Sequence, residues 1–182
     1  MKLHIGGWEA KEGWKILNIQ KRDNVDFVGD ISDLSQFKDN SISEVYASHV
    51  FEHVKYNDLK KTLLGIYRIL VSGGKFYISV PNMNVLFRQF LEKKNQTKTK
   101  IKIMRMIFGG QIDEYDFHYF GWDFELLSGL LKKVGFEEIE KVDKKNEERH
   151  LRRLNENYHK LEIQKMIDRK NLKANDQGLQ KS

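Results

Sequence analysis

Short apolar runs, each closed by glycine, proline or a polar side chain, recur through the first half of the chain. Their length and their β-branched and aromatic content are typical of β-strands, and the residues that follow them are typical of turns. We therefore predict strands at 2–6, 14–20, 25–30, 43–48 and 75–82. The single proline, Pro81, falls at the end of the last run, where its missing N–H disturbs a sheet least.

Apolar residues return at helical spacing in other segments. Leu59, Leu63 and Ile66 mark one face of a helix over 56–70, which the glycines of "SGG" are expected to end. Asp123 and Gly135 are suited to start and end a later helix. We predict further helices at 84–94, 100–108 and 123–136, a loop rich in glycine and aromatic residues at 108–122, and a short strand at 137–142.

Strands that alternate with helices indicate an α/β fold built on a parallel sheet whose faces are covered by helices. Only about six residues separate the first two predicted strands, whereas a parallel crossover normally takes about a dozen or more. Either the first helix is reduced to a turn around "WEAKEG", or the strand ends differ from those predicted.

Polar or glycine residues stand at the end of each predicted strand. In an open parallel sheet, ligands bind beyond the carboxyl ends of the strands. Glycines there let the backbone approach a ligand, and polar side chains can reach ribose hydroxyls and an adenine amine, so this edge suits a nucleoside. The strand-end residues are Gly6-Gly7, Gln20, Gly29-Asp30, Ser48-His49 and Pro81-Asn82.

The stretch "SHVFEHV" contains His49, Glu52 and His53 in the spacing H-x-x-E-H, which occurs in inverted zinc proteases. A catalytic zinc site needs a third protein ligand and an open position for water. The motif supplies only two histidines, and neither Glu92 nor Glu125 lies in a second recognisable half-motif. We therefore expect no metal site.

Over Lys2 to Val142 the chain resembles the small class I S-adenosylmethionine-dependent methyltransferases. The resemblance rests on "LHIGG", on "SHV-x-EH" followed by "R-I-L-x-x-GG" and a strand ending "VPN", and on "FGGQ" followed by "DFHYFGW" and a helix ending "KKVGF". It implies a doubly wound, mostly parallel, Rossmann-like sheet, with S-adenosyl-L-methionine as cofactor. The expected methyltransferase-like domain is 1–143.

The resemblance assigns the turn at Gly6 and Gly7 to the methionine portion of the cofactor. Trp8 stands where the family usually has the last glycine, so the loop is expected to follow another path. The acidic residue that normally holds the ribose hydroxyls is replaced by Gln20. An amide lacks the charge-assisted hydrogen bonds of a carboxylate, so weaker cofactor binding is expected.

Further along the chain, the resemblance places Asp30 and Ile31 at the adenine and Ser48 and His49 at the methionine end of the cofactor. Glu52 and His53, in the turn after His49, are assigned packing and hydrogen bonding on the cofactor side.

The acceptor side is expected on the loop "DEYDFHYFGW". His118 matches a histidine that recurs in similar sequences, and an imidazole can act as general base on a hydroxyl or amine. A loop histidine bonded to the backbone is the competing interpretation. Asp116 could orient His118 only if the loop folds back. Arg105 and the preceding lysines could attract an acidic acceptor, although an exposed helix face explains them equally well.

Charge is concentrated at the end of the chain. Residues 144–182 carry 11 Lys and Arg against 6 Asp and Glu, out of a net charge of +6 for the whole sequence. We expect a charged helical tail there, partly disordered, in place of the last antiparallel strand of the family. Without cysteine, disulfides and thiolate chemistry are excluded. No apolar run approaches the roughly 20 residues of a membrane span, so a cytoplasmic protein is expected.

Three functions remain in competition. The first is methyl transfer to a small-molecule acceptor with an oxygen or nitrogen nucleophile. The second is a methyltransferase fold that binds ligand without catalysis, suggested by Trp8, Gln20 and the missing last strand. The third is RNA modification with help from the basic tail, although nucleic acid is not favoured, because acids and few aromatics lie among its basic residues. A nicotinamide-dependent oxidoreductase would need G-x-G-x-x-G, which Gly6-Gly7-Trp8 does not supply.

Overall fold

The computed structural model describes residues 1–141. Residues 1–139 form one compact unit. The predicted charged tail at 144–182, the predicted domain boundary after 143 and Val142 of the predicted last strand lie outside the described residues.

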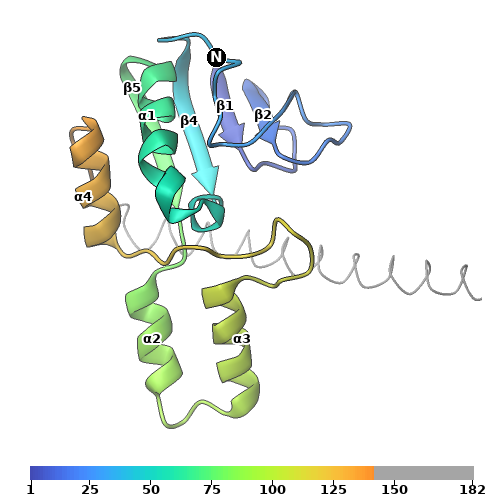
Figure 1. Cartoon of the computed structure of the whole chain (residues 1–182), viewed down its shortest axis with the longest axis vertical. Helices are drawn as coiled ribbons and strands as arrows, with labels where there is room; N and C mark the ends of the chain where they lie inside the picture. Colours follow the sequence, from blue (N-terminus) through green and yellow to red (C-terminus); the bar gives the residue numbers. More distant parts are fainter. Residues whose placement is uncertain (142–182) are drawn as a thin grey trace, which may run out of the picture. The chain divides into compact units, whose positions relative to one another are not determined.

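A five-stranded parallel sheet forms the centre of this unit, in the order β3-β2-β1-β4-β5 (Figure 1). The prediction of a parallel sheet is confirmed, because each neighbouring pair in this order is parallel. All carboxyl ends therefore lie along one edge. The strands are β1 (Lys2–Ile5), β2 (Trp14–Asn18), β3 (Phe27–Val28), β4 (Ile42–Ser48) and β5 (Leu70–Ser79).

Helices follow the later strands. Helix α1 packs beside α4, and α2 packs against α3 as a separate helical pair after the carboxyl end of β5 (Figure 1). The apolar side chains of α1, such as Leu63 and Ile66, join Val45 of β4 in the core because they recur on one face of the helix. The helices are η1 (Phe51–His53), η2 (Tyr56–Asp58), α1 (Leu59–Ile69), α2 (Met83–Leu91), α3 (Thr97–Phe108) and α4 (Phe124–Val134).

The first crossover contains no helix. Lys2 pairs with Trp14 and Ile5 with Leu17, so β1 and β2 are parallel neighbours joined only by the turns and bends of residues 6–13. The strand positions were therefore predicted correctly, and the first helix is reduced to a turn. The loop ends at Gly13, and β2 begins at Trp14, where the sequence predicted the start of the second strand.

The boundary between α1 and β5 was predicted in the wrong place. The helix ends at Ile69, and β5 begins at once with Leu70, which is buried and pairs with Ile42. The glycines at 73 and 74 lie inside the strand, at a register irregularity opposite Ile42 to Glu44. Because Leu70 is buried and paired, the strand begins before the glycines. The glycines therefore lie in an irregular part of the strand and do not end the helix.

The short strand predicted at 137–142 was also wrong for its described part, because residues 137–141 form no strand. Phe136 and Ile139 instead pack against the core through their side chains, and Glu138 has a φ of 49°, which interrupts an extended backbone. Phe136 and Ile139, three residues apart, are therefore partly buried although their segment does not pair with the sheet.

The two faces of β5 differ in their exposure. In β5, Phe76 packs on the core, whereas Lys75 and Tyr77, on the opposite face, are exposed.

In the part of the chain that the structure describes, no helix is long and apolar enough to cross a membrane.

Both ends of α4 agree with the sequence. The Asp123 carboxylate accepts a hydrogen bond from the Leu126 amide at 2.9 Å. Gly135 ends the helix with a φ of 112°, and its amide is bonded to the carbonyls of the last turn. A Cβ at Gly135 would lie 3.3 Å from the Tyr67 ring, so both backbone and space favour glycine.

We expect Gly135→Ala to lower the free energy of unfolding by roughly 1–2 kcal/mol, because alanine is strained in the left-handed region. Gly129→Ala, in the middle of the same helix where a Cβ would meet nothing within 4 Å, is the matched control. It should raise the free energy by about 0.5–1 kcal/mol. Urea denaturation measures both, and equal signs for the two variants would contradict this account of the helix end.

Candidate functional site

The loop after β1 is closely packed at the carboxyl edge of the sheet. Gly6 has a φ of 74°, and its amide donates to the Leu17 carbonyl at 2.9 Å. A Cβ at Gly6 would lie 2.5 Å from Val50, in the turn after β4. A Cβ at Gly7 would lie 2.5 Å from the His4 ring. Glycine is therefore required at both positions by the packing of this edge.

Asn18, the last residue of β2, holds this loop to the next one. Its side chain is 4% exposed, and its amide donates to the Gly7 carbonyl at 3.0 Å. Its side-chain oxygen, Oδ1, accepts a hydrogen bond from the backbone amide of Gln20, also at 3.0 Å. The sequence analysis missed Asn18. The available signal was a polar residue directly after the buried Ile16-Leu17 pair.

Trp8 is held by residues that follow β2. The Arg22 guanidinium lies 3.8 Å from the centre of the Trp8 ring, and the Asn24 side chain donates to the Trp8 carbonyl. Arg22 also donates to the Gln20 side chain at 3.4 Å. Gln20 and Trp8 therefore share Arg22 as a neighbour at the end of β2.

The two residues predicted at the adenine have different environments. Asp30 is exposed after β3, and one of its oxygens accepts from the Ser32 amide at 2.7 Å. Ile31 is 8% exposed and belongs to the hydrophobic core. Asp30 is thus available to a ligand at the sheet edge, while most of Ile31 packs inward.

The end of β4 places His49 in an unusual backbone conformation. Its φ is 53°, and its amide donates to the Ser79 carbonyl at 2.9 Å, which continues the pairing of Ser48 with Ser79. The His49 imidazole lies 3.1 Å from one oxygen of Glu52. Partial burial lowers the pKa of His49, but the hydrogen bond and negative charge of Glu52 outweigh it, so the pKa lies above its usual value.

The predicted acceptor loop docks on η1, the turn that contains the H-x-x-E-H motif. The Tyr119 and Phe120 amides both donate to the Glu52 carbonyl, at 2.7 and 3.3 Å. The His53 Nδ1 lies 3.0 Å from the Phe117 carbonyl. Segments about 65 residues apart in the chain are joined in this way at the carboxyl end of β4 (Figure 1).

His118 is held from the other side by the end of α3. Its amide donates to the Phe108 carbonyl at 3.1 Å, and its Nδ1 lies 3.0 Å from the Met106 carbonyl. Burial is the main cause that lowers the pKa of His118 below its usual value. The Asp116 carboxylate accepts from the Ile112 amide at 3.4 Å, so it shapes the loop, and a backbone carbonyl orients His118 instead.

The candidate residues therefore lie in two groups. Gly6, Gly7 and Gln20 meet through Asn18, and Asp30 lies exposed at the end of β3, the strand beside β2. Around Glu52, the structure brings together His49, His53 and His118. The centres of the His53 and His118 rings lie 4.7 Å apart.

A sequence profile described as a methyltransferase domain matches residues 11–78, which include β2 to β5. β1 and the loop of Gly6 and Gly7 precede the matched residues and belong to the same sheet, whose order is β3-β2-β1-β4-β5. The match to the methyltransferase-domain family therefore covers residues 11–78 of the chain. The five-stranded parallel sheet has the class I methyltransferase fold, as the sequence predicted.

Several solved structures are similar to this chain. A putative methyltransferase of Haloferax volcanii in complex with the Trm112 methyltransferase activator has 20% identity and a TM-score of 0.49; the match covers 76% of this chain and 61% of that one. A SAM-dependent methyltransferase from Archaeoglobus fulgidus has 20% identity and a TM-score of 0.46, with coverages of 87% and 77%. Phosphoethanolamine N-methyltransferase 2 of Haemonchus contortus, in complex with S-adenosyl-L-methionine, has 19% identity and a TM-score of 0.48, with coverages of 88% and 41%. No curated protein matches the chain.

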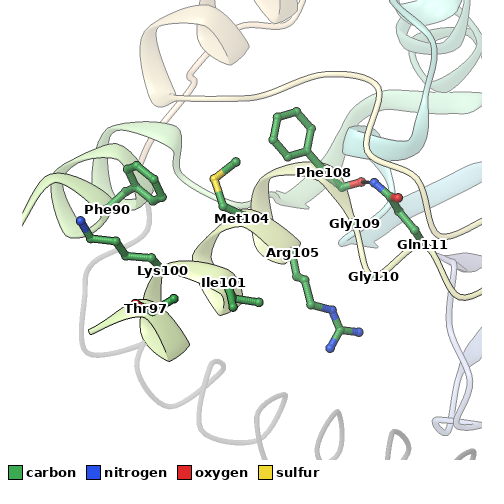
Figure 2. A pocket seen from close by; sticks show the side chains of 10 residues that line it. All are labelled: Phe90, Thr97, Lys100, Ile101, Met104, Arg105, Phe108, Gly109, Gly110 and Gln111. Carbon is green, nitrogen blue, oxygen red and sulfur yellow. Dashed lines mark hydrogen bonds between the residues drawn. The ribbon is translucent and has the colours of Figure 1, made fainter. Parts of the chain in front are cut away.

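A hollow of about 490 Å³ lies along α3. Figure 2 shows its lining, from Phe90 in α2, through α3, to the turn at Gly109 and Gly110. Lys100 lies 5.3 Å from the centre of the Phe90 ring, and Arg105 also lines the hollow. Its lining is therefore mainly apolar with two basic groups.

We expect Asn18→Ala to lower the free energy of unfolding by roughly 1–3 kcal/mol, because it removes two hydrogen bonds of a buried amide. Exchange of the Gln20 amide hydrogen should also accelerate. Gln20→Ala, at a half-buried position, is the control and should change stability by less than about 0.5 kcal/mol. Urea denaturation with hydrogen exchange measures both effects, and a neutral Asn18→Ala would contradict the role given to this side chain.

Proposed function

We propose that this methyltransferase domain binds S-adenosyl-L-methionine at the carboxyl edge of its sheet and transfers the methyl group to a small-molecule acceptor with an oxygen or nitrogen nucleophile. One observation carries the proposal. The parallel strands end together in a glycine turn with a positive φ at Gly6, the Gln20 amide and the exposed Asp30 carboxylate. A turn, an amide and a carboxylate at adjacent strand ends suit a nucleoside.

The residues present fit this cofactor. Asp30 keeps one carboxylate oxygen on the Ser32 amide and is exposed, so its charge is available to a hydrogen-bond donor of the nucleoside. Gln20 can donate and accept at the ribose hydroxyls. The loop of Gly6 and Gly7 and the turn of Ser48 and His49 would hold the methionine end. When bound, S-adenosyl-L-methionine supplies a methyl group that its sulfonium makes electrophilic.

The protein's part in the reaction is to orient the acceptor in line with that methyl group. The loop of 109–122, docked on η1, is the proposed acceptor side. His118 is the candidate general base there, since its Nδ1 is held by the Met106 carbonyl and the other ring nitrogen remains to accept a proton. Lys100 and Arg105 in the hollow along α3 favour an acceptor with a negative charge.

A catalytically inactive binding protein is the second candidate. It is favoured by Gln20 in place of an acidic residue, and by the contact of Arg22 with both Gln20 and the Trp8 ring. This candidate predicts cofactor binding without turnover, so an assay of methyl transfer from labelled cofactor over a panel of acidic, hydroxyl and amine acceptors separates the two.

Titration calorimetry of S-adenosyl-L-methionine into the full chain tests the binding step, and saturable heat is expected. Asp30→Asn should weaken binding roughly fivefold to tenfold, because it removes the charge but keeps the acceptor for the Ser32 amide. Asp33→Asn is the matched control, since Asp33 likewise accepts from the amide two residues on and should leave affinity unchanged. Absence of binding at millimolar cofactor would exclude the proposed function, and equal effects of both substitutions would exclude Asp30 from the site.

Restoring an acidic residue provides an independent test. Gln20→Glu should tighten cofactor binding by roughly fivefold to tenfold, because a carboxylate makes stronger, charge-assisted hydrogen bonds to ribose hydroxyls. Gln20→Leu should weaken it by a similar factor. The same calorimetric titration measures both, and the ribose assignment fails if Gln20→Glu binds no more tightly than the unmodified chain.

A further inference from the structure

The H-x-x-E-H motif acquires a third partner only in the folded chain. Glu52 and His53 come from η1, and His118 comes from the loop that docks on it. One ligand-type atom from each of these three side chains lies within 4.8 Å of the other two. His49, the first histidine of the motif, is outside this group and instead contacts an oxygen of Glu52 at 3.1 Å.

Both histidines of the group are oriented by the backbone. The Nδ1 of His53 lies 3.0 Å from the Phe117 carbonyl, and the Nδ1 of His118 lies 3.0 Å from the Met106 carbonyl. A carbonyl only accepts, so each Nδ1 is the protonated nitrogen and each Nε2 carries the lone pair. Histidines that bind metals are held in the same way, with the second ring nitrogen donating to a carbonyl or carboxylate.

Glu52 contributes a buried carboxylate oxygen that has no hydrogen-bond partner. Its side chain is 1% exposed. Oε1 is bonded to His49, whereas Oε2 is buried without a hydrogen-bond partner. A buried carboxylate oxygen without a partner is costly unless a cation or donor compensates it. The ion pair with His49 covers one oxygen, and the other remains for a ligand.

From these observations we infer that Glu52, His53 and His118 bind a divalent transition-metal ion, with His49 supporting the carboxylate from behind. Ligand atoms around a tetrahedral zinc ion at about 2.0–2.2 Å lie roughly 3.3 Å from one another. The distances between these ligand atoms therefore shorten by up to about 1.5 Å on binding, which rotation of the two half-buried imidazoles allows.

Two imidazoles and one carboxylate select zinc, cobalt or a similar ion over magnesium and calcium, which prefer oxygen ligands. Three protein ligands leave one position open to water or to an acceptor oxygen. A bound ion occupies the Nε2 lone pair of His118, so in the metal-loaded protein this residue is a ligand and not the general base. Gly6, Gln20 and Asp30 lie outside the metal site, and His49 is the residue that the cofactor and metal proposals share.

The absence of a metal was predicted from the sequence because no third ligand could be identified. His118 lies 65 residues beyond His53, in a segment with no zinc half-motif, so its role follows only from the docking of the loop.

The experiment is calorimetric titration of the full chain, stripped of metal with chelator, using zinc chloride, cobalt chloride and, as a control, magnesium chloride. We expect one zinc ion per chain, a visible cobalt absorption typical of low coordination, and no binding of magnesium. The same substitution is then made at three histidines, because asparagine keeps a donor at the position of Nδ1 and removes Nε2.

His53→Asn and His118→Asn should each weaken zinc binding by about 100-fold or more and abolish the cobalt absorption, since they lose a direct ligand. His49→Asn is the matched control and should stay within about threefold of the unmodified chain, because it keeps the donor to Glu52. Glu52→Gln keeps the shape of the side chain and removes its charge, so it should also weaken zinc binding. Melting temperatures of the metal-free variants show that they are folded.

Failure to bind zinc at submillimolar concentration would overturn the inference. Undiminished binding in both His53→Asn and His118→Asn would do the same, and would assign the zinc to other histidines such as His150 and His159. Loss of binding in His49→Asn equal to that in His53→Asn would replace the proposed site with one that uses the two histidines of the motif. A protein that binds S-adenosyl-L-methionine but no zinc would overturn the metal site alone and leave the proposed function standing.

Discussion

The carbonyl of Glu52 is the point on which the candidate site depends. It accepts the amides of Tyr119 and Phe120, and thereby fixes the loop after α3 to the turn after β4. The neighbouring bond between His53 and the Phe117 carbonyl, and the core position of Trp122 at 0% exposure, hold the same loop at two further points. Because these contacts are made mostly by the backbone, they set the position of His118 with little dependence on the side chains around it. The proposed acceptor side and the inferred metal site both depend on this docking.

A different constraint acts at the first loop, where space is limiting. The loop joins two parallel strands in residues 6–13 without a helix, and the neighbouring side chains of Val50 and His4 fill the room that side chains at Gly6 and Gly7 would need. Asn18 then ties this loop to the end of β2 from a buried position. The glycines therefore serve packing first, and a nucleoside would use an edge that is already ordered by the protein. This order reduces the conformational entropy that binding would cost.

The two regions divide the proposed chemistry between them. The exposed carboxylate of Asp30 and the neutral side chain of Gln20 suit the proposed nucleoside, whereas Glu52 and the three histidines around it form a separate cluster. Burial of Glu52 strengthens its interaction with any cation or imidazole nearby, since little water is present to screen it. The raised pKa of His49 and the lowered pKa of His118 are two results of this environment, one from the carboxylate and one from desolvation.

The sequence by itself determined the local elements and their order. Apolar periodicity located the five strands and α1 to α4, and capping residues such as Asp123 and Gly135 located helix ends, because these signals act within a few residues. It also identified the strand ends as the candidate edge, since parallel strands must end together. Local signals misplaced the start of β5 and predicted a strand at 137–142, because in both places burial of one or two side chains outweighed local preference. Only the tertiary structure decided that the side chain of Asn18 joins two loops and that His118 meets Glu52 and His53. The first depends on where a buried side chain points, and the second on backbone hydrogen bonds between distant segments, and neither leaves a signature in the sequence.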